Sequence, residues 1–344
     1  MKRCSVALFL VFISCLSEVQ VAGQNYYVYV CAESDDQVFL VKQGSKGLEI
    51  VKTIEVGSFP AETEGPHGIQ ISPDGQYWYV SLAHGFPYGS VHKYKTGSDE
   101  WVDDVKVGMY PATIDVAGST QLLYVVNMNL HGPPEPTDIS VIETDTMTEV
   151  ARVSSGVRPH GGRLSQDETS FYSVNMMDSE LVETDALGFE VLRRLFLGKH
   201  VQPSWVTRPT RNGTVFITGN NAGKIFEVDL KNWKVSRIFD APGGPYNAAV
   251  TPDGMTLVVT YKEGNAVGFW DIHSGRERSR VPTTGTIPHG VALSPDGHYA
   301  FVTNEGVGDD PGVVEAYTIH DAQRVGSVNV GKQAGGIAFW KLET

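Results

Sequence analysis

The chain has 344 residues, of which 41% are hydrophobic and 19% are charged. This composition excludes a mainly disordered protein and supplies enough apolar side chains for a large core. The formal net charge is −13. A surface this acidic repels phosphate backbones, so we expect no nucleic-acid partner.

The first 23 residues have the pattern of a signal peptide. A basic start is followed by an apolar run over positions 5–14, which is too short to span a membrane. Small residues then precede Gln24, so we expect cleavage there and a mature domain over residues 24–344 that is periplasmic or secreted. Lipid anchoring at Cys15 is the less favoured alternative, because Phe12 fits a bacterial lipobox poorly. We expect no transmembrane segment, since no later run is long and apolar enough.

Cysteine usage narrows the chemistry. Of the three cysteines, only Cys31 lies outside the signal segment, so the mature chain has no internal disulfide framework. The sequence has no Cys-x-x-Cys-His motif for a covalently attached c-type haem. Cys31 follows an apolar run, and we interpret it as a buried small side chain rather than a reactive thiol.

An internal repeat determines the predicted fold. Pro66-His67-Gly68, Pro159-His160-Gly161 and Pro288-His289-Gly290 each precede a turn sequence containing Asp and then an apolar segment. Degenerate copies begin at Pro111, Pro203 and Pro245, and the six starts are 42 to 48 residues apart. Each unit contains four strand-like segments, here called strands A to D. This is the period of a β-propeller blade.

The count of units predicts an all-β, seven-bladed β-propeller with four-stranded blades. Residues 335–340 form a strand A with nothing after it, and residues 26–30 form a strand B with nothing before it. We therefore expect one blade to be shared between the two ends of the chain, which closes the ring without an open edge.

Three of the strand B segments resemble a known repeat. The YVTN repeat of the YncE-like seven-bladed propellers, a family of exported bacterial proteins, is similar to Tyr79-Val80-Ser81, Tyr124-Val125-Val126-Asn127 and Phe301-Val302-Thr303-Asn304. The resemblance implies the fold over the whole mature chain but implies no single function. Related propellers include the cytochrome d1 haem domain, the propeller of nitrous-oxide reductase, and lactonases of the phosphogluconolactonase type.

Five histidines are predicted to share one face. Strand A leaves this face and strand B returns to it, so residues at the start of strand A and after strand B meet there. His67, His160 and His289 hold equivalent positions at the start of strand A, and His84 and His131 follow strand B. Neutral imidazole binds transition metals, so these five residues are a hypothetical site for copper or another transition metal. The alternative is that the three axial histidines cap backbone carbonyls at the channel mouth.

Other residues at the same blade position suggest a ligand wall. Trp205, Tyr246 and Asn247 lie at or beside the start of strand A in two further blades. Flat rings with a polar edge suit a small planar ligand. The alternative is that these side chains only plug the channel.

Acidic residues gather in the connections after strand B. The members of this acidic group are Glu33, Asp35, Asp36, Glu135, Asp138, Glu305, Asp309 and Asp310. We interpret them as a solvated surface, because Asp309-Asp310 lacks the ligand spacing of a calcium loop.

Three functional hypotheses follow from the sequence. The first is an exported, monomeric propeller that binds a small ligand or a protein partner on the histidine-bearing face. The second is a metal-dependent or haem-dependent redox protein that uses the histidines at the channel mouth. The third and more distant one is a lactonase-type hydrolase, because no acid–base group is evident and no Gly-x-Ser-x-Gly or His-Glu-x-x-His motif is present.

Overall fold

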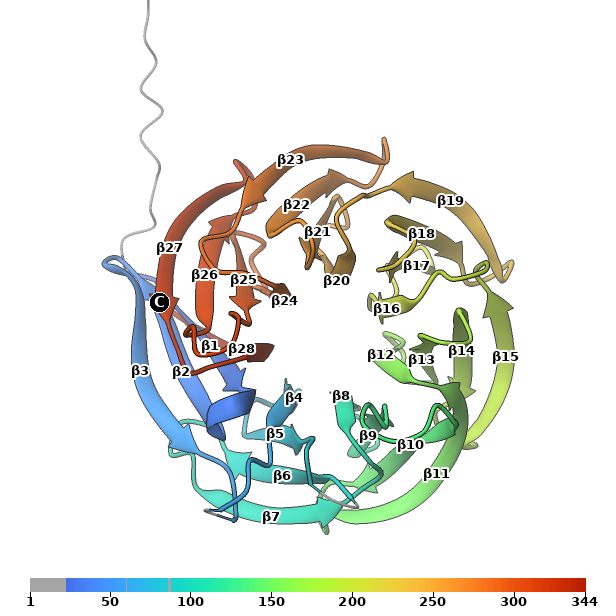
Figure 1. The fold of residues 1–344 in the computed structure, drawn as a ribbon, viewed down its shortest axis with the longest axis horizontal. Helices are drawn as coiled ribbons and strands as arrows, with labels where there is room; N and C mark the ends of the chain where they lie inside the picture. Colours follow the sequence, from blue (N-terminus) through green and yellow to red (C-terminus); the bar gives the residue numbers. More distant parts are fainter. Residues whose placement is uncertain (1–22, 60, 86–87) are drawn as a thin grey trace, which may run out of the picture.

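A computed structural model describes residues 23–59, 61–85 and 88–344. These residues form seven four-stranded antiparallel sheets arranged as blades around a central axis (Figure 1). The predicted seven-bladed propeller is therefore confirmed. Cys15 and all of the expected signal peptide except Gly23 lie outside the described residues. Within the described part of the chain, no helix has the length and hydrophobicity needed to cross a membrane.

The shared blade joins both ends of the chain, and we name each blade by its innermost strand. The β28 blade consists of β28 (Ala334–Glu343), β1 (Asn25–Ala32), β2 (Gln37–Gly44) and β3 (Gly47–Glu55), with a short 3₁₀ helix, η1 (Glu33–Asp35), after β1.

Six further blades follow in chain order, each given from its inner to its outer strand. The first three are β4 (Pro66–Ile71), β5 (Tyr77–Leu82), β6 (Ser90–Lys95) and β7 (Trp101–Lys106); β8 (Pro111–Val116), β9 (Leu122–Asn127), β10 (Pro136–Glu143) and β11 (Thr148–Val157); and β12 (Pro159–Leu164), β13 (Ser170–Asn175), β14 (Glu180–Asp185) and β15 (Glu190–Phe196). The last three are β16 (Pro203–Val206), β17 (Thr214–Gly219), β18 (Lys224–Asp229) and β19 (Lys234–Asp240); β20 (Pro245–Val250), β21 (Thr256–Tyr261), β22 (Ala266–Asp271) and β23 (Arg276–Pro282); and β24 (Pro288–Leu293), β25 (Tyr299–Asn304), β26 (Val313–Thr318) and β27 (Gln323–Asn329).

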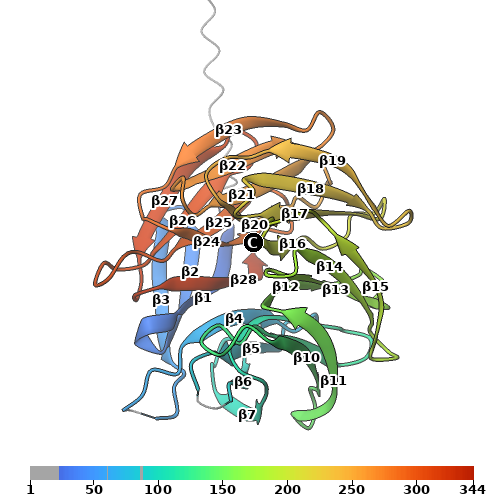
Figure 2. The same ribbon diagram turned by 45° about the vertical axis from the view of Figure 1, so that its right-hand side comes forward.

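Ring closure depends on the pairing of β28 with β1. The two strands are antiparallel, with Val28 opposite Phe339 and Val30 opposite Ile337. Figure 2 shows the same succession of blades from a turned view, with β28 among the inner strands. The predicted sharing of one blade between the chain ends is confirmed, and the ring has no unpaired seam at this point.

The core lies between neighbouring blades. In the β12 blade the inner strand β12 is buried along most of its length, whereas the outer strand β15 alternates between exposed and half-buried residues. Between the β28 and β4 blades, Trp78 stacks on Tyr94 with ring centroids 4.1 Å apart and lies 5.3 Å from Tyr29. Cys31 is buried in the same cluster, as expected for a small apolar side chain. Such large, fully buried rings contribute strongly to packing between blades.

The tight turns between strands A and B match their sequences. In Ser72-Pro73-Asp74-Gly75, Gly75 has a φ of 73° and its amide donates to the Ser72 carbonyl at 2.8 Å. Gly254 and Gly297 hold the same left-handed conformation in their blades. These turns lie at the end of strand A opposite the histidines, so they define the far face of the ring.

One backbone hydrogen bond is repeated in all seven blades at the channel mouth. The residue before strand A, here the pre-A position, has a left-handed φ, and its carbonyl accepts from the residue that follows strand B, here the post-B position. The pre-A residues are Gly65, Tyr110, Arg158, Gln202, Gly244, Ile287 and Gln333, and their post-B partners are Ala83, Met128, Met176, Asn220, Lys262, Glu305 and Glu33. This repeated contact fixes the backbone that carries the polar side chains of the site.

Candidate functional site at the channel mouth

The three axial histidines meet inside the channel. The ring centroid of His67 lies 5.5 Å from that of His289 and 6.2 Å from that of His160. All three line one cavity of about 40 Å³. Each histidine is the second residue of its strand, β4, β12 or β24. The proline before it fixes φ, and the glycine after it permits close packing of backbones. At Gly68, for example, a side chain would overlap with the carbonyl oxygen of Ala112.

A buried carboxylate links two of the predicted histidines. Glu33, at the post-B position of the β28 blade, is only 2% exposed. Its Oε2 lies 2.8 Å from His67 Nδ1, and its Oε1 lies 2.6 Å from His84 Nε2 and accepts from the Tyr110 hydroxyl at 2.9 Å. Our interpretation of Glu33 as a solvated surface residue is therefore wrong. The pairing of β1 with β28 places the Glu33 side chain in the channel mouth, where donors from the β4 and β8 blades satisfy both carboxylate oxygens.

His131 extends this cluster to solvent. His131 Nε2 lies 3.2 Å from His84 Nδ1, and His131 is exposed, whereas His84 is partly buried. The loop that carries His131 is held by Arg158, whose guanidinium donates to the carbonyls of Asn129 and Gly132. The result is a chain of hydrogen-bonding groups from the surface through His84 to Glu33 and His67.

The pKa shifts in this cluster follow from burial and pairing. Burial raises the pKa of Glu33, but interaction with His67 and hydrogen bonds from His67 and His84 outweigh it, so the pKa lies well below its usual range. The hydrogen bond to Glu33 raises the pKa of His84 and outweighs the opposite effect of burial. Burial and the neighbouring Glu33 raise the pKa of Tyr110 far above its usual value. Glu33 is therefore ionised and Tyr110 is neutral at neutral pH.

The tautomer of His160 follows from its two partners. Its Nδ1 lies 2.7 Å from the Ser204 carbonyl oxygen, which can only accept, so Nδ1 carries a proton. Burial, with a smaller contribution from His67, lowers the pKa of His160 to about 3, so the ring is neutral at pH 7. Its Nε2 is therefore an acceptor, and the Tyr246 hydroxyl donates to it at 2.9 Å.

An ion pair lies on the other side of the mouth. Lys262 Nζ is 2.7 Å from Glu305 Oε1 and 3.9 Å from the centroid of the Tyr246 ring. Burial lowers the pKa of Lys262, but Tyr246 and Glu305 raise it by more, so the ammonium group stays charged. His289 Nε2 is 3.6 Å from Glu305 Oε1, and burial together with Lys262 lowers the pKa of His289 well below its usual value. Glu305 is thus partly buried and paired rather than fully solvated.

The predicted ligand-wall residues surround the same channel. Trp205 and Asn247 line the 40 Å³ cavity with the axial histidines. Tyr246 is not among the lining residues, but it contacts His160 and Lys262. Asp35 and Asp36 belong to the acidic group that follows strand B. Both accept hydrogen bonds from backbone amides of neighbouring segments, with Asp36 Oδ1 accepting from Gly65 at 2.7 Å.

The predicted metal set finds no matching geometry. Among the described residues, no group of three or more His, Cys, Asp or Glu side chains is arranged to hold a metal ion. Both ring nitrogens of His160 already have partners, so metal binding there would break the contact with Ser204 or Tyr246. Metal binding by the five histidines stays a prediction.

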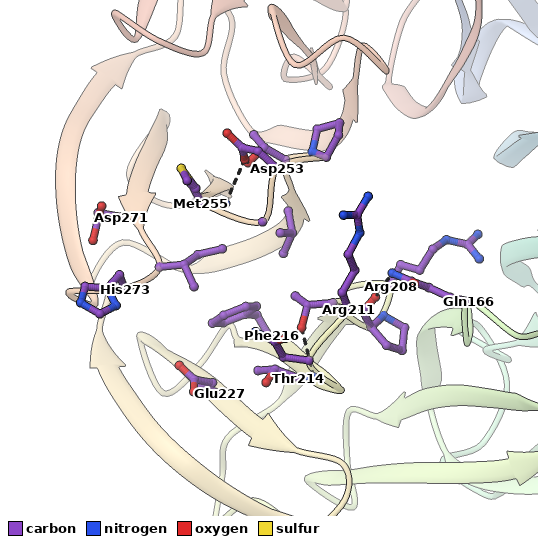
Figure 3. Close-up of a pocket in the computed structure, with 18 of the residues that line it drawn as sticks. Gln166, Arg208, Arg211, Thr214, Phe216, Glu227, Asp253, Met255, Asp271 and His273 are labelled. Atoms are coloured by element: carbon purple, nitrogen blue, oxygen red, sulfur yellow. Dashed lines mark hydrogen bonds between the residues drawn. The ribbon is translucent and has the colours of Figure 1, made fainter.

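A larger hollow lies elsewhere, in a groove of about 1130 Å³ between the β16 and β20 blades on the far face. In Figure 3, Arg208 and Arg211 come from one wall, and Asp253 and Met255 come from the opposite wall. Two arginines of this groove form ion pairs within the protein, Arg208 with Asp115 and Arg237 with Glu227. The channel mouth is therefore the better candidate, because it concentrates groups with shifted pKa values.

Sequence reasoning identified the histidines but not their partners. Tyr110 and Lys262 were not singled out, and Glu33 and Glu305 were assigned to the surface. The available signal was positional, because each of these four residues lies at a pre-A or post-B position. Comparing the seven blades at those positions would have placed all four at the mouth.

Comparison with known proteins supports the fold more than any function. No protein-family profile matches the chain. Antigen Lp49 of Leptospira interrogans is 26% identical over 225 residues, which is 59% of this chain and 49% of that protein. YncE of Salmonella typhi is 38% identical over 55 residues, which is 16% of this chain and 15% of YncE. The chain thus spans about half the length of Lp49 at most, and membership of the YncE-like family stays a prediction.

Three solved structures share the fold over nearly their whole length. The periplasmic gluconolactonase PpgL of Pseudomonas aeruginosa superposes with a TM-score of 0.77 at 16% identity, covering 92% of this chain and 99% of PpgL. A Lactobacillus plantarum protein gives 0.75 at 14% identity, with 92% and 100% coverage. A Bacteroides fragilis protein, whose proposed activity is that of a 6-phosphogluconolactonase, gives 0.74 at 11% identity, with 92% and 98% coverage. At these identities the likeness establishes the seven-bladed propeller.

Proposed function

We propose that the channel mouth binds a small polar molecule and catalyses acid–base hydrolysis of the lactonase type. The observation that carries this proposal is the buried Glu33 carboxylate bonded to both His84 and His67. A carboxylate that orients an imidazole and raises its pKa is the usual way of building a general base that works near neutral pH. The gluconolactonase activity attributed to two proteins of the same fold agrees with this chemistry.

His84 is the proposed general base. Glu33 accepts a hydrogen bond from His84 Nε2, so in the neutral ring the lone pair is on Nδ1, which faces His131 rather than the core. When the exposed His131 ring turns away, a water molecule takes its place at Nδ1 and gives it one proton, and the water oxygen attacks the lactone carbonyl carbon. The carbon–oxygen ring bond then breaks, and the ring oxygen takes the proton from His84. The products are a hydroxyl group and a carboxylic acid, so atoms and protons balance.

The remaining groups of the mouth have supporting roles. Lys262 supplies a charged ammonium group for the oxyanion that forms on the carbonyl, and its own charge is balanced by Glu305. Tyr110 orients Glu33 through its hydroxyl. His131 exchanges protons between His84 and solvent, since it is exposed and contacts Nδ1 directly.

The proposal is tested by measuring the hydrolysis of gluconolactone and other small lactones above the spontaneous rate. His84→Gln is expected to lower the catalysed rate about 10²–10⁴-fold, the usual contribution of a general base. The matched control is His298→Gln, which replaces an exposed histidine in a turn on the far face and is expected to keep full activity. A folded wild-type protein with no rate above background on any lactone contradicts the proposal.

Ligand binding without catalysis is the second candidate function. It is favoured by the full pairing of Glu33, since both carboxylate oxygens already have donors within the protein. Calorimetry with the same lactones separates the two candidates. Saturable binding that His84→Gln weakens, without turnover in the wild type, identifies the mouth as a binding site only.

A further inference from the structure

The channel cavity contains an arginine without a counter-charge of its own. Arg163, the fifth residue of β12, lines the cavity together with the three axial histidines. Its Nη1 donates to the Gly162 carbonyl at 2.7 Å, and its guanidinium stacks on Trp205, 4.4 Å from the ring centroid. Across the described ranges, no carboxylate oxygen pairs with Arg163 within 4 Å. Most of its N–H donors are therefore left for another partner.

The nearest acidic residue is already occupied. Asp115 is fully buried, and Arg208 Nη2 donates to its two oxygens at 2.9 and 2.8 Å. Gln70 Nε2 and the Leu164 amide donate to the same carboxylate. Asp115 is therefore bonded to Arg208 and is not free to pair with Arg163. Burial lowers the pKa of Arg163 to about 10, against the opposing effect of Asp115, so the group still carries its proton at neutral pH.

A second, independent observation points to an absent partner. Asn247 also lines the cavity and is 4% exposed, and its Oδ1 has no hydrogen-bond partner. Nδ1 of His289 likewise makes no hydrogen bond of normal geometry, although the Gly335 carbonyl is near. Unpaired polar atoms are costly when buried, so a group that satisfies them stabilises the folded state. A half-turn of the Asn247 amide presents its NH₂ group to the cavity instead of the oxygen.

We propose that this cavity binds a small monovalent anion between the guanidinium of Arg163 and the amide of Asn247. Such an anion would supply the counter-charge that Arg163 lacks within contact distance. The cavity volume of about 40 Å³ exceeds the roughly 10–15 Å³ needed for one water molecule but does not admit a sugar or a phosphate ester. The ligand class is thus a halide or an oxyanion of a few atoms, and it differs from the substrate proposed for the mouth.

Bromide is the probe, because it is monovalent and can be located by anomalous scattering. Crystals of the protein grown in sodium bromide are expected to show a peak beside Arg163 in the cavity. In solution, bromide is expected to raise the midpoint of thermal unfolding with a saturable dependence on concentration, as for any ligand of the folded state. Arg163→Met should abolish both the peak and the saturable shift.

Two further variants keep the test decisive. Arg211→Met removes an exposed arginine of the far-face groove and is expected to retain the wild-type response to bromide. If Arg163→Met does not fold, Asn247→Leu replaces it and should weaken the bromide response at least about tenfold. A wild-type crystal without a bromide peak in the cavity overturns the proposal, as does an equal bromide response in Arg163→Met. Neither result bears on lactone hydrolysis, which depends on His84 rather than Arg163.

Discussion

His84 Nε2 and Glu33 Oε1 lie 2.6 Å apart although 51 residues separate them in the sequence. The two residues belong to neighbouring blades, and the second of these exists only because the ends of the chain pair with each other. The acid–base cluster is thus a product of ring closure rather than of any one repeat. Substitution of Glu33 should therefore change both the pKa of His84 at the channel mouth and the stability of the ring.

Replacing Glu33 with Gln should lower the pKa of His84. The hydrogen bond to the Glu33 carboxylate is the largest cause that raises this pKa, and burial, which lowers it, remains in the variant. NMR titration of the histidine ring protons measures the change directly. His298, which is exposed on the far face, is the internal control for the measurement. An unchanged His84 titration would show that Glu33 does not set its pKa.

The same variant should change how stability depends on acid. Because the folded-state pKa of Glu33 lies below its unfolded value of about 4.5, its contribution is present above that value and is lost as the pH falls through the folded pKa. Hydrogen bonds to a charged group contribute about 1.5–3 kcal/mol, so Glu33→Gln should be less stable at pH 7. The difference from wild type should shrink below pH 4.5, as followed by urea unfolding at a series of pH values. A constant difference contradicts the assigned ionisation.

Tyr246→Phe should destabilise the fold by about 1–3 kcal/mol, because His160 Nε2 loses its donor and stays buried without a partner. Urea unfolding measures the loss. Tyr88→Phe is the matched control: its side chain is exposed, so removing the hydroxyl should have almost no effect. Equal stabilities of the two variants would mean that the Tyr246 hydroxyl does not satisfy His160.

Adjacent glycines of β28 offer a sharp test of packing at the closure. A methyl group on Gly336 would overlap with the carbonyl oxygen of His67, whereas the atoms nearest to a methyl group on Gly335 are 3.9 Å away. Gly336→Ala should therefore cost about 1–3 kcal/mol or more, as expected for overpacking. Gly335→Ala should be nearly neutral.

Deleting residues 335–344 should abolish cooperative unfolding altogether, because it removes the strand that pairs with β1. A truncated chain that melts like wild type would contradict closure by β28.

Strain at the pre-A position should be removable. Ile287 has a φ of 58°, which is unfavourable for a β-branched residue, whereas Gly65 and Gly244 hold the equivalent place in two other blades. Ile287→Gly should stabilise the protein by about 0.5–1 kcal/mol in thermal or urea unfolding, offset in part by the greater entropy of the unfolded chain. Gly244→Ala should lower the stability of the protein. A destabilised Ile287→Gly variant would show that side-chain contacts outweigh the strain.

The sequence predicted the ring well because its information is periodic. Pro66, Pro159 and Pro288 mark the starts of inner strands, and the structure begins β4, β12 and β24 at these residues. The local pattern also placed the histidines near the axis. It could not show that Glu33 is buried, because that burial comes from β28 and from donors on two other blades. The charge state of Lys262 depends in the same way on Tyr246 and Glu305.

The order in which the chain is made gives the shared blade a further consequence. Glu33 is among the earliest parts of the ring to be synthesised, and β28, which pairs with β1 beside it, is the last. Until β28 is paired with β1, His67 and His84 of the β4 blade have no fixed carboxylate to orient them. A chain that is still being synthesised therefore lacks the assembled site, and the proposed chemistry begins only when the final strand is in place.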